Sequence, residues 1–365
     1  MCKYKNKVWL LMSLVFCLTL FPASALESNS IIGTNYENET IVAATVWLEE
    51  NYGDYYYLRN VDAAIVRQFE TTDVLRYTIA IECETMLKAN TVYDLPYVQG
   101  MQEKMATQKN INAIQTTVIN EFIADLEEYI GVYTHMTLDV VAEVNKLHRN
   151  DSIILYFQDG YDTTLYPIEI LSINDTDMKQ DGSTVASEII ASHQNAGIAK
   201  GYSSYKRTDA RDYAQTYSSN PTSCTCGSSS CVATYNSSKW NSSYTGYGST
   251  HSDCANFVSQ AMRAGGLPTD TTWYAGSSAW IGGLALKNHM TSKGYWDTST
   301  FAAANAGNII RWYTTSDSPN HVGMITLNDT VTHRYSAHTR DRLDYAFTNS
   351  SYYQTNCEYY TIKTN

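Results

Sequence analysis

Beyond its first 21 residues, this 365-residue chain has no long apolar run, so no later segment is predicted to cross a bilayer. Basic residues are also scarce, since 25 Lys and Arg stand against 37 Asp and Glu and the formal net charge is −12. An acidic protein is repelled by phosphate backbones, which makes nucleic acid a poor partner. The sparse lysine and abundant Tyr, Asn, Ser and Thr favour instead a polar surface suited to carbohydrate or peptide contact.

Cysteine is limited to eight residues, two of them within the first 25. The other six are too few for a disulfide scaffold in a chain of this length. Cys224, Cys226 and Cys231 form a compact group that lacks a fourth ligand and the usual C-x-x-C pairs of a zinc site. Outside a cell we expect a disulfide within this group, with Cys357 as a further candidate partner, while a metal site and free thiols remain alternatives. No metal and no other cofactor is predicted.

The N-terminus has the pattern of a secretory signal peptide. Lys3, Lys5 and Lys7 precede the uncharged stretch Val8–Phe21, and Ala23-Ser24-Ala25 follows as a small-x-small cleavage site. The apolar stretch is shorter than the ~20 residues of a spanning helix, which disfavours the alternative of an uncleaved anchor. The sequence therefore predicts a signal peptide over residues 1–25 and a secreted, extracellular protein that meets a membrane only during export. Retention at the cell wall is left open.

Residues 27–173 are predicted to form an N-terminal α+β domain. Alternating apolar residues indicate half-buried strands at Leu75–Cys83 and Met136–Val144, and spacings of three and four indicate an amphipathic helix over Ile111–Ile130. A short helix is expected at Ile41–Leu48. No catalytic constellation occurs in this region, so its role is not predicted.

Residues 174–204 turn polar, with Asp181-Gly182-Ser183 as a turn signal, and are predicted to be a linker. The remainder, residues 205–365, is predicted to be a second α+β domain in which helices precede an antiparallel sheet. The expected helices are Cys254–Ala264 and Ala279–Lys293, and the expected strands are Ile309–Tyr313, His321–Leu327 and Val331–His338.

The segment HSDCANFVSQ, residues 251–260, carries the strongest chemical signal. Ser252 or Asp253 can cap a helix that begins at Cys254. A thiol in the first turn faces the positive end of the helix dipole, which stabilises the reactive thiolate. Cys254 is therefore a candidate nucleophile, and a buried, inert cysteine is the alternative.

Two later histidines could assist such a thiol. His321 opens an apolar strand, from which it could accept the proton of Cys254 as a general base, although a strand-end histidine without a chemical role is the alternative. His338 ends the following strand and could orient the ring of His321, for which Asp341 and Asn320 are rival candidates.

These residues resemble a known family. Asp253 to Gln260 looks like the D-C-x-N-F-V-S-Q motif of the putative amidase domain, within the NlpC/P60-like, papain-like group of cysteine hydrolases. Tyr205 to Tyr217 resembles the opening helix of that family, and the segments AGGLP (264–268), HVGMI (321–325) and HTRDR (338–342) continue the pattern in order. The resemblance covers roughly residues 205–345. Asn308 departs from it, because relatives usually carry Gly-Asp where this chain has Gly307-Asn308.

The resemblance implies a papain-like C-terminal domain in which Cys254 attacks an amide, with His321 as base and His338 as third member. The acyl group would pass through a thioester, and the backbone N–H of Cys254 would contribute to an oxyanion hole. The resemblance also suggests that the side chains of Asn256, Trp273, Tyr274 and Trp280 line the cleft, and core packing is the alternative for the aromatic ones.

We therefore predict a secreted bacterial cysteine amidase or peptidase, acting on peptidoglycan or another peptide-type amide. A non-catalytic cell-surface binding or adhesion protein built on an inactive hydrolase fold is the alternative. The retention of Cys254, His321 and His338 disfavours that alternative, since an inactive relative is expected to have lost one of them.

Overall fold

The structure is a computed structural model that describes residues 31–109, 111–146, 153–158, 164–192, 205–220, 237–247, 253–313, 321–348 and 356–363. By its contacts the chain separates into residues 1–38 and residues 39–365, and each unit is considered by itself. Helix α2 (Ile31–Tyr52) begins in the first unit and continues into the second. No helix within the described ranges is long and apolar enough to span a membrane.

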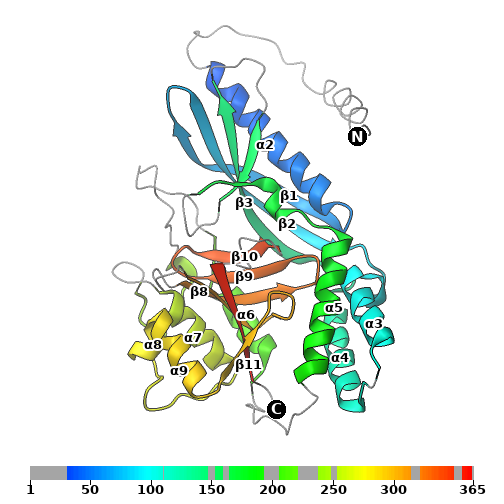
Figure 1. Cartoon of the computed structure of the whole chain (residues 1–365). Helices are drawn as coiled ribbons and strands as arrows, with labels where there is room; N and C mark the ends of the chain where they lie inside the picture. Colours follow the sequence, from blue (N-terminus) through cyan, green and yellow to red (C-terminus); the bar gives the residue numbers. More distant parts are fainter. Residues whose placement is uncertain are drawn as a thin grey trace. The chain divides into compact units, whose positions relative to one another are not determined.

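One mixed sheet of eleven strands runs through residues 39–365 (Figure 1). Its order is β1-β2-β3-β10-β9-β8-β7-β11-β6, and β4 and β5 extend from β3. Neighbouring strands are antiparallel except β3 and β10, which run parallel where Tyr345 pairs with Thr137. The strands are β1 (Tyr56–Glu70), β2 (Val74–Leu87), β3 (Thr134–Asn145), β4 (Ile154–Phe157), β5 (Tyr166–Pro167), β6 (Trp296–Ser299), β7 (Ile309–Trp312), β8 (His321–Asn328), β9 (His333–Ala337), β10 (Arg342–Phe347) and β11 (Cys357–Ile362).

The predicted strands at 75–83 and 136–144 are confirmed as parts of β2 and β3. Along β2 the buried residues Tyr77, Ile79 and Ile81 alternate with less buried ones, as a strand with one covered face requires. Strand β1 was not predicted, because most of its side chains are at least partly exposed. It lies at the edge of the sheet and its pairing with β2 is interrupted by register shifts, so it lacks a continuous apolar alternation.

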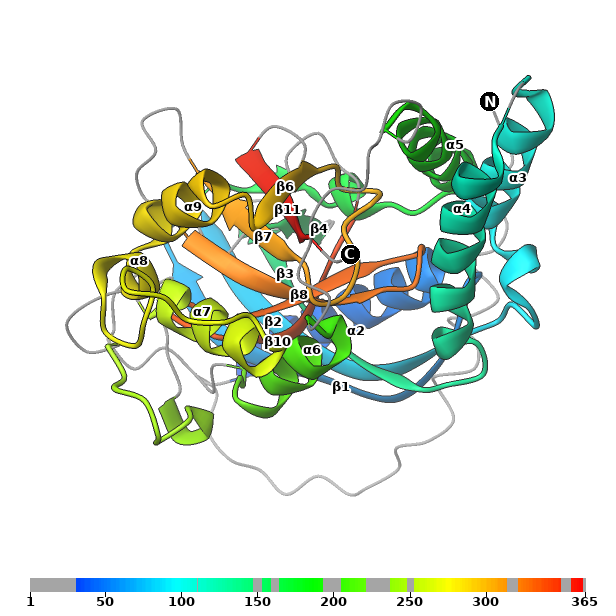
Figure 2. The same ribbon diagram turned by 90° about the horizontal axis from the view of Figure 1, so that it is seen from below.

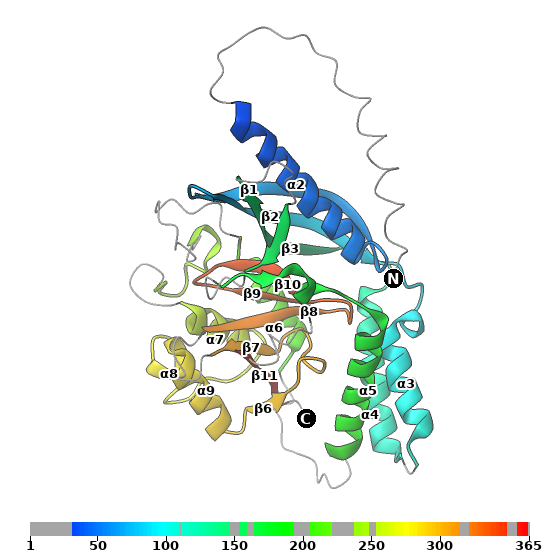
Figure 3. The same cartoon turned by 45° about the horizontal axis from the view of Figure 1, so that its top comes forward.

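Three helices, α3 (Pro96–Thr107), α4 (Ala113–Asp125) and α5 (Asp175–Ser192), lie side by side (Figure 3). Helix α5 occupies most of the segment predicted to be a polar linker. Its glycine is a packing residue and does not mark a turn, since a Cβ on Gly182 would lie 1.9 Å from the carbonyl oxygen of Tyr97 on α3. Gly100 of α3 approaches the backbone of Lys179 on α5 about as closely, so each glycine lets its helix lie against the backbone of the other.

The C-terminal part has the predicted order of helices followed by sheet. Helices α6 (Arg207–Thr216), α7 (Cys254–Ala264), α8 (Ser278–Ile281) and α9 (Gly283–Ser292) gather on one side of β7 and β8 (Figure 2). Phe257, Val258 and Ala261 of α7 share a buried cluster with Val322 and Met324 of β8. The α+β class is thus confirmed.

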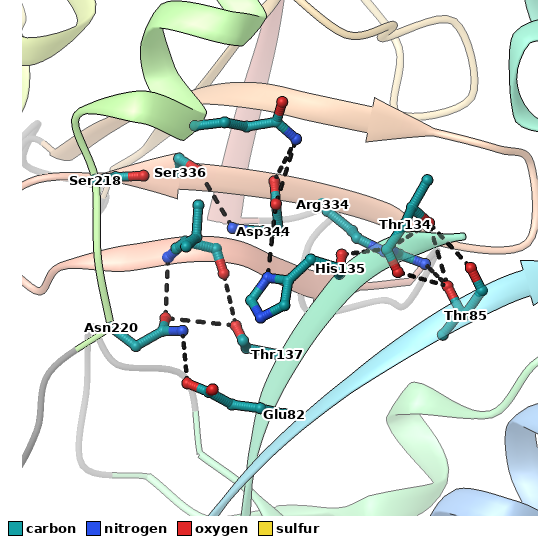
Figure 4. Close-up of polar contacts among 12 residues, drawn as sticks. Glu82, Thr85, Thr134, His135, Thr137, Ser218, Asn220, Arg334, Ser336 and Asp344 are labelled. Carbon is teal, nitrogen blue, oxygen red and sulfur yellow. Dashed lines mark hydrogen bonds and ion pairs between the residues drawn. The ribbon is translucent and has the colours of Figure 1, made fainter. Parts of the chain in front are cut away.

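Buried polar contacts join the N-terminal strands to the C-terminal part of the sheet. Arg334 of β9 is fully buried, and its guanidinium donates to the hydroxyls of Thr85 (2.6 Å) and Thr134 (2.8 Å), as Figure 4 shows. It also lies 3.7 Å from the carboxylate of Asp329, which accepts a hydrogen bond from the hydroxyl of Tyr56 at 2.7 Å.

A second group of contacts holds β10. Its Arg342 donates to Asp139 of β3 at 2.9 Å, and Thr137 of β3 donates to the carbonyl of Leu343 at 2.8 Å. Asn220, which follows α6, accepts from the backbone N–H of Leu343 and donates to Glu82 of β2 (Figure 4). Residues of the N-terminal strands and of the C-terminal part therefore both hold the strands around the candidate site in place.

Candidate functional site

Helix α7 begins at Cys254, as predicted, and Asp253 occupies the N-cap position. The carboxylate of Asp253 makes no capping bond to the helix backbone. Its Oδ1 accepts instead from the backbone N–H of Tyr247 (2.9 Å) and from the side-chain amide of Asn256 (2.8 Å). Ser252, the rival cap, lies outside the described residues. Cys254, the first residue of the helix, is buried in the core, since it is only 1% exposed.

His338 lies against the start of this helix. Its Nδ1 is 2.7 Å from Oδ2 of Asp253, and its Nε2 is 2.7 Å from the carbonyl oxygen of Tyr217. The ring is stacked between Phe257, at a centroid distance of 4.1 Å, and Trp240, at 4.4 Å. Both ring nitrogens are thus engaged, so His338 cannot also orient the ring of His321 in this arrangement.

The remaining polar residues of the DCANFVSQ motif brace the helix against its surroundings. Asn256 Oδ1 accepts from the indole N–H of Trp280 at 2.8 Å. The hydroxyl of Ser259 donates to the carbonyl of Trp280 (2.9 Å) and accepts from the indole of Trp273 (3.1 Å). Gln260 accepts from the hydroxyl of Tyr213 on α6 at 2.6 Å.

These bonds fit the core-packing alternative for Trp273 and Trp280, and a cleft-lining role for them and for Asn256 stays a prediction. All three are at most 2% exposed, and they pack with one another behind α7, because each indole N–H must find an acceptor once it is buried. Tyr274 is the exception, since it is 52% exposed.

His321 is the first residue of β8, as predicted, and is 7% exposed. Side chains alternate along a strand, and Val322 and Met324 belong to the cluster that contains Cys254. The ring of His321 lies on the other side, with its centroid 5.2 Å from that of Trp312. The imidazole of His321 would therefore have to approach the Cys254 thiol around the end of β8, where His321 lies.

Burial lowers the pKa of His321 to about 3, and the positive charges of Arg340 and Arg342 contribute in the same direction. The imidazole is therefore neutral at physiological pH. A neutral ring can accept a proton, but its protonated form is disfavoured unless a nearby negative charge, such as a thiolate, stabilises it.

The turn after β9 is hydrogen-bonded to the start of α7. Thr339 and Arg340 have left-handed φ angles of 59° and 73°. Oγ1 of Thr339 accepts from the backbone N–H of Asp253 at 2.6 Å, and the backbone N–H of Thr339 donates to Asp341 Oδ1 at 2.8 Å. Asp341, a rival orienter of His321, is thus bonded to its own turn and is fully buried. Asn320, the other rival, lies outside the described residues.

Sequence reasoning missed the carbonyl of Tyr217 and the hydroxyl of Thr339 as partners in this arrangement. A backbone carbonyl leaves no sequence signal, whereas Thr339 lies inside the HTRDR segment that resembles the family. The disulfide candidates Cys224, Cys226 and Cys231 lie outside the described residues. Among the residues that the structure does describe, no group of His, Cys, Asp and Glu is arranged to hold a metal ion.

Comparison with protein families agrees with the geometry at the level of the domain. Residues 204–362 match the family model described as "Putative amidase domain". This range contains Cys254, His321 and His338, and it supports an amidase-like domain that acts on an amide bond. Searches of curated proteins and of solved structures gave no match.

Proposed function

We propose that this chain is a secreted, cysteine-dependent amide hydrolase in which Cys254 is the nucleophile and His321 the general base. The observation that carries the proposal is the position of Cys254 as first residue of α7, inside a motif whose polar side chains hold that helix end in place. The match of residues 204–362 to an amidase family supports the class of bond.

The reaction would proceed in two balanced steps. The thiolate of Cys254 attacks the amide carbonyl carbon, the C–N bond breaks, and the amine leaves with the proton that His321 took from the thiol. Water then attacks the thioester, His321 accepts a proton from it, and the acid is released as the thiol reforms. The positive end of α7 stabilises both the thiolate and the developing oxyanion.

Peptidoglycan is the substrate that we propose, either at the muramoyl–alanine bond or within the stem peptide. The predicted signal peptide would deliver the enzyme to the wall, and the surface composition suits a glycan–peptide polymer. Two observations favour the alternative, a binding protein on an inactive fold. Substrate must reach a thiol that is 1% exposed, and the ring of His321 lies on the side of β8 away from the cluster that contains Cys254.

The test is digestion of purified peptidoglycan by the chain without residues 1–25, with Cys254→Ala beside it and the released fragments read by mass spectrometry. We expect fragments from the native protein and none from the variant, with fragment masses that identify the cleaved bond. His289→Gln serves as a control for substitution of a buried polar residue elsewhere in the domain. Equal release by the native protein and Cys254→Ala would exclude Cys254 as the nucleophile, and no release by either would exclude peptidoglycan.

A further inference from the structure

We propose that Asp253 and His338 form a buried ion pair that keeps the net charge beside the Cys254 thiol near zero, so that the α7 N-terminus can stabilise the thiolate. Both are positioning residues, and they act on the thiol without touching substrate. The inference rests on the proposed function only in taking Cys254 as the nucleophile.

The hydrogen-bond partners determine the charge of each group. Asp253 is 1% exposed, and its carboxylate accepts at Oδ1 from Tyr247 and Asn256 while Oδ2 faces His338. A carboxylate with several donors is held in its ionised form. Nε2 of His338 faces a carbonyl oxygen, which can only accept. Both ring nitrogens therefore carry protons, and the ring is an imidazolium.

The pair matters for Cys254 because Asp253 precedes it directly in the chain. A lone carboxylate at that position would raise the pKa of the thiol by like-charge repulsion and oppose the helix dipole. The imidazolium of His338 cancels that charge at 2.7 Å. Phe257 and Trp240 enclose its ring on both faces, so the compensating charge stays in place.

Other ionisable groups of the described residues neighbour the pair. Burial raises the pKa of Tyr213 on α6, and the charge of Asp253 is among the smaller causes. Tyr217 and Tyr247 contact the pair through their backbone atoms. Arg340 and Asp341 follow His338 in the turn and carry opposite charges. None of these groups replaces the charge of His338 next to Asp253.

The experiment is a titration of the Cys254 thiol by NMR in the full chain labelled with ¹³C at cysteine Cβ, with Cys254→Ser used to assign the signal. This readout needs no substrate and no reagent access. In His338→Gln the amide still donates to Asp253 but brings no charge, so we expect the thiol pKa to rise by about one unit. Alkylation of Cys254 at a pH below its pKa should slow by about tenfold accordingly.

Asp253→Asn is the matched variant. Its amide can donate to a neutral His338 that still bonds Tyr217, so the hydrogen bonds remain and the net charge stays zero. The thiol pKa should move less than in His338→Gln, and the double variant should move back toward the native value. His289→Gln removes a buried histidine that lies on α9 and neighbours Asp270. This substitution should leave the pKa of the Cys254 thiol unchanged.

Equal shifts in His338→Gln and Asp253→Asn, or none in either, would overturn the proposal. A second measurement does not depend on the folding of any variant, because ¹⁵N-histidine spectra of the native chain at pH 7 should show both ring nitrogens of His338 protonated. A neutral ring there would also overturn it. Loss of peptidoglycan digestion with an intact pattern of thiol shifts would instead contradict the proposed function alone.

Discussion

At the residue scale, the charge of each buried histidine depends on what its ring nitrogens meet. Both ring nitrogens of His338 meet acceptors, whereas His321 and His333 lie in surroundings that disfavour charge. Burial lowers the pKa of His333 to about 3, as it does for His321, and the ring of His333 packs on that of Phe301 at 3.9 Å.

The lowered pKa values predict a loss of stability in acid. Below about pH 6.5 the unfolded chain protonates its histidines, whereas folded His333 and His321 bind protons only near pH 3. The free energy of unfolding should therefore fall as the pH drops through this window, by up to about 1.4 kcal/mol per pH unit for each group. We expect His333→Phe to reduce that slope, as measured by urea unfolding from pH 7 to pH 4. An unchanged slope would mean that His333 is protonated in the folded chain.

At the scale of elements, close approach of backbones decides where helices can cross. Helices α3 and α5 meet at Gly100 and Gly182, and the buried apolar residues of α5 are Met178, Val185, Ala186 and Ile190. The other faces of α5 are polar, and this polarity makes its segment resemble a linker in the sequence. Helix α7 shows the opposite case, since its apolar face and its start were both visible in the sequence.

The crossing predicts a steric effect at one position. A Cβ on Gly182 would lie 1.9 Å from the carbonyl oxygen of Tyr97, so Gly182→Ala must push the helices apart. We expect destabilisation of about 2 kcal/mol or more, measured by thermal or urea unfolding. Ser183→Ala, one residue along the same helix, should be neutral or slightly stabilising because alanine favours helix. Similar effects of both substitutions would argue against the close crossing.

At the scale of residues 39–365 taken together, the sheet is continuous between the N-terminal strands and the matched domain. The parallel pairing of β3 with β10 and the burial of Arg334 at this junction join β9 and β10, which carry the turn with His338, to β2 and β3. The N-terminal strands thus take part in holding the candidate site. The division into domains at residues 174–204 stays a prediction.

The contribution of Arg334 at this junction to the free energy of unfolding can be measured. Arg334→Met removes donors from Thr85 and Thr134 and leaves the buried carboxylate of Asp329 without its cation, which should cost about 3–5 kcal/mol. Arg59→Met is the control, because Arg59 pairs with Glu84 at the surface, where such a pair contributes little to stability. Urea unfolding measures both. A small effect of Arg334→Met would show that the two halves are only loosely coupled.

The fold could be predicted where a local period was strong. Strands β2 and β3 and helix α7 followed from alternation or from three-and-four spacing, and the order of helices before sheet followed from the same patterns. Strand β1 and helix α5 could not be predicted, because an exposed edge strand has no continuous apolar face and a helix packed through glycine resembles a turn.

The sequence by itself determined the α+β fold class, the start of α7 at Cys254 and the candidate site residues, because these depend on local pattern and residue chemistry. Only the tertiary structure decided their partners. It paired His338 with Asp253 and Tyr217, placed the ring of His321 against Trp312, and buried Trp273 and Trp280 behind the helix. Hydrogen bonds between segments far apart in the chain depend on how strands and helices pack, and no local period encodes that packing.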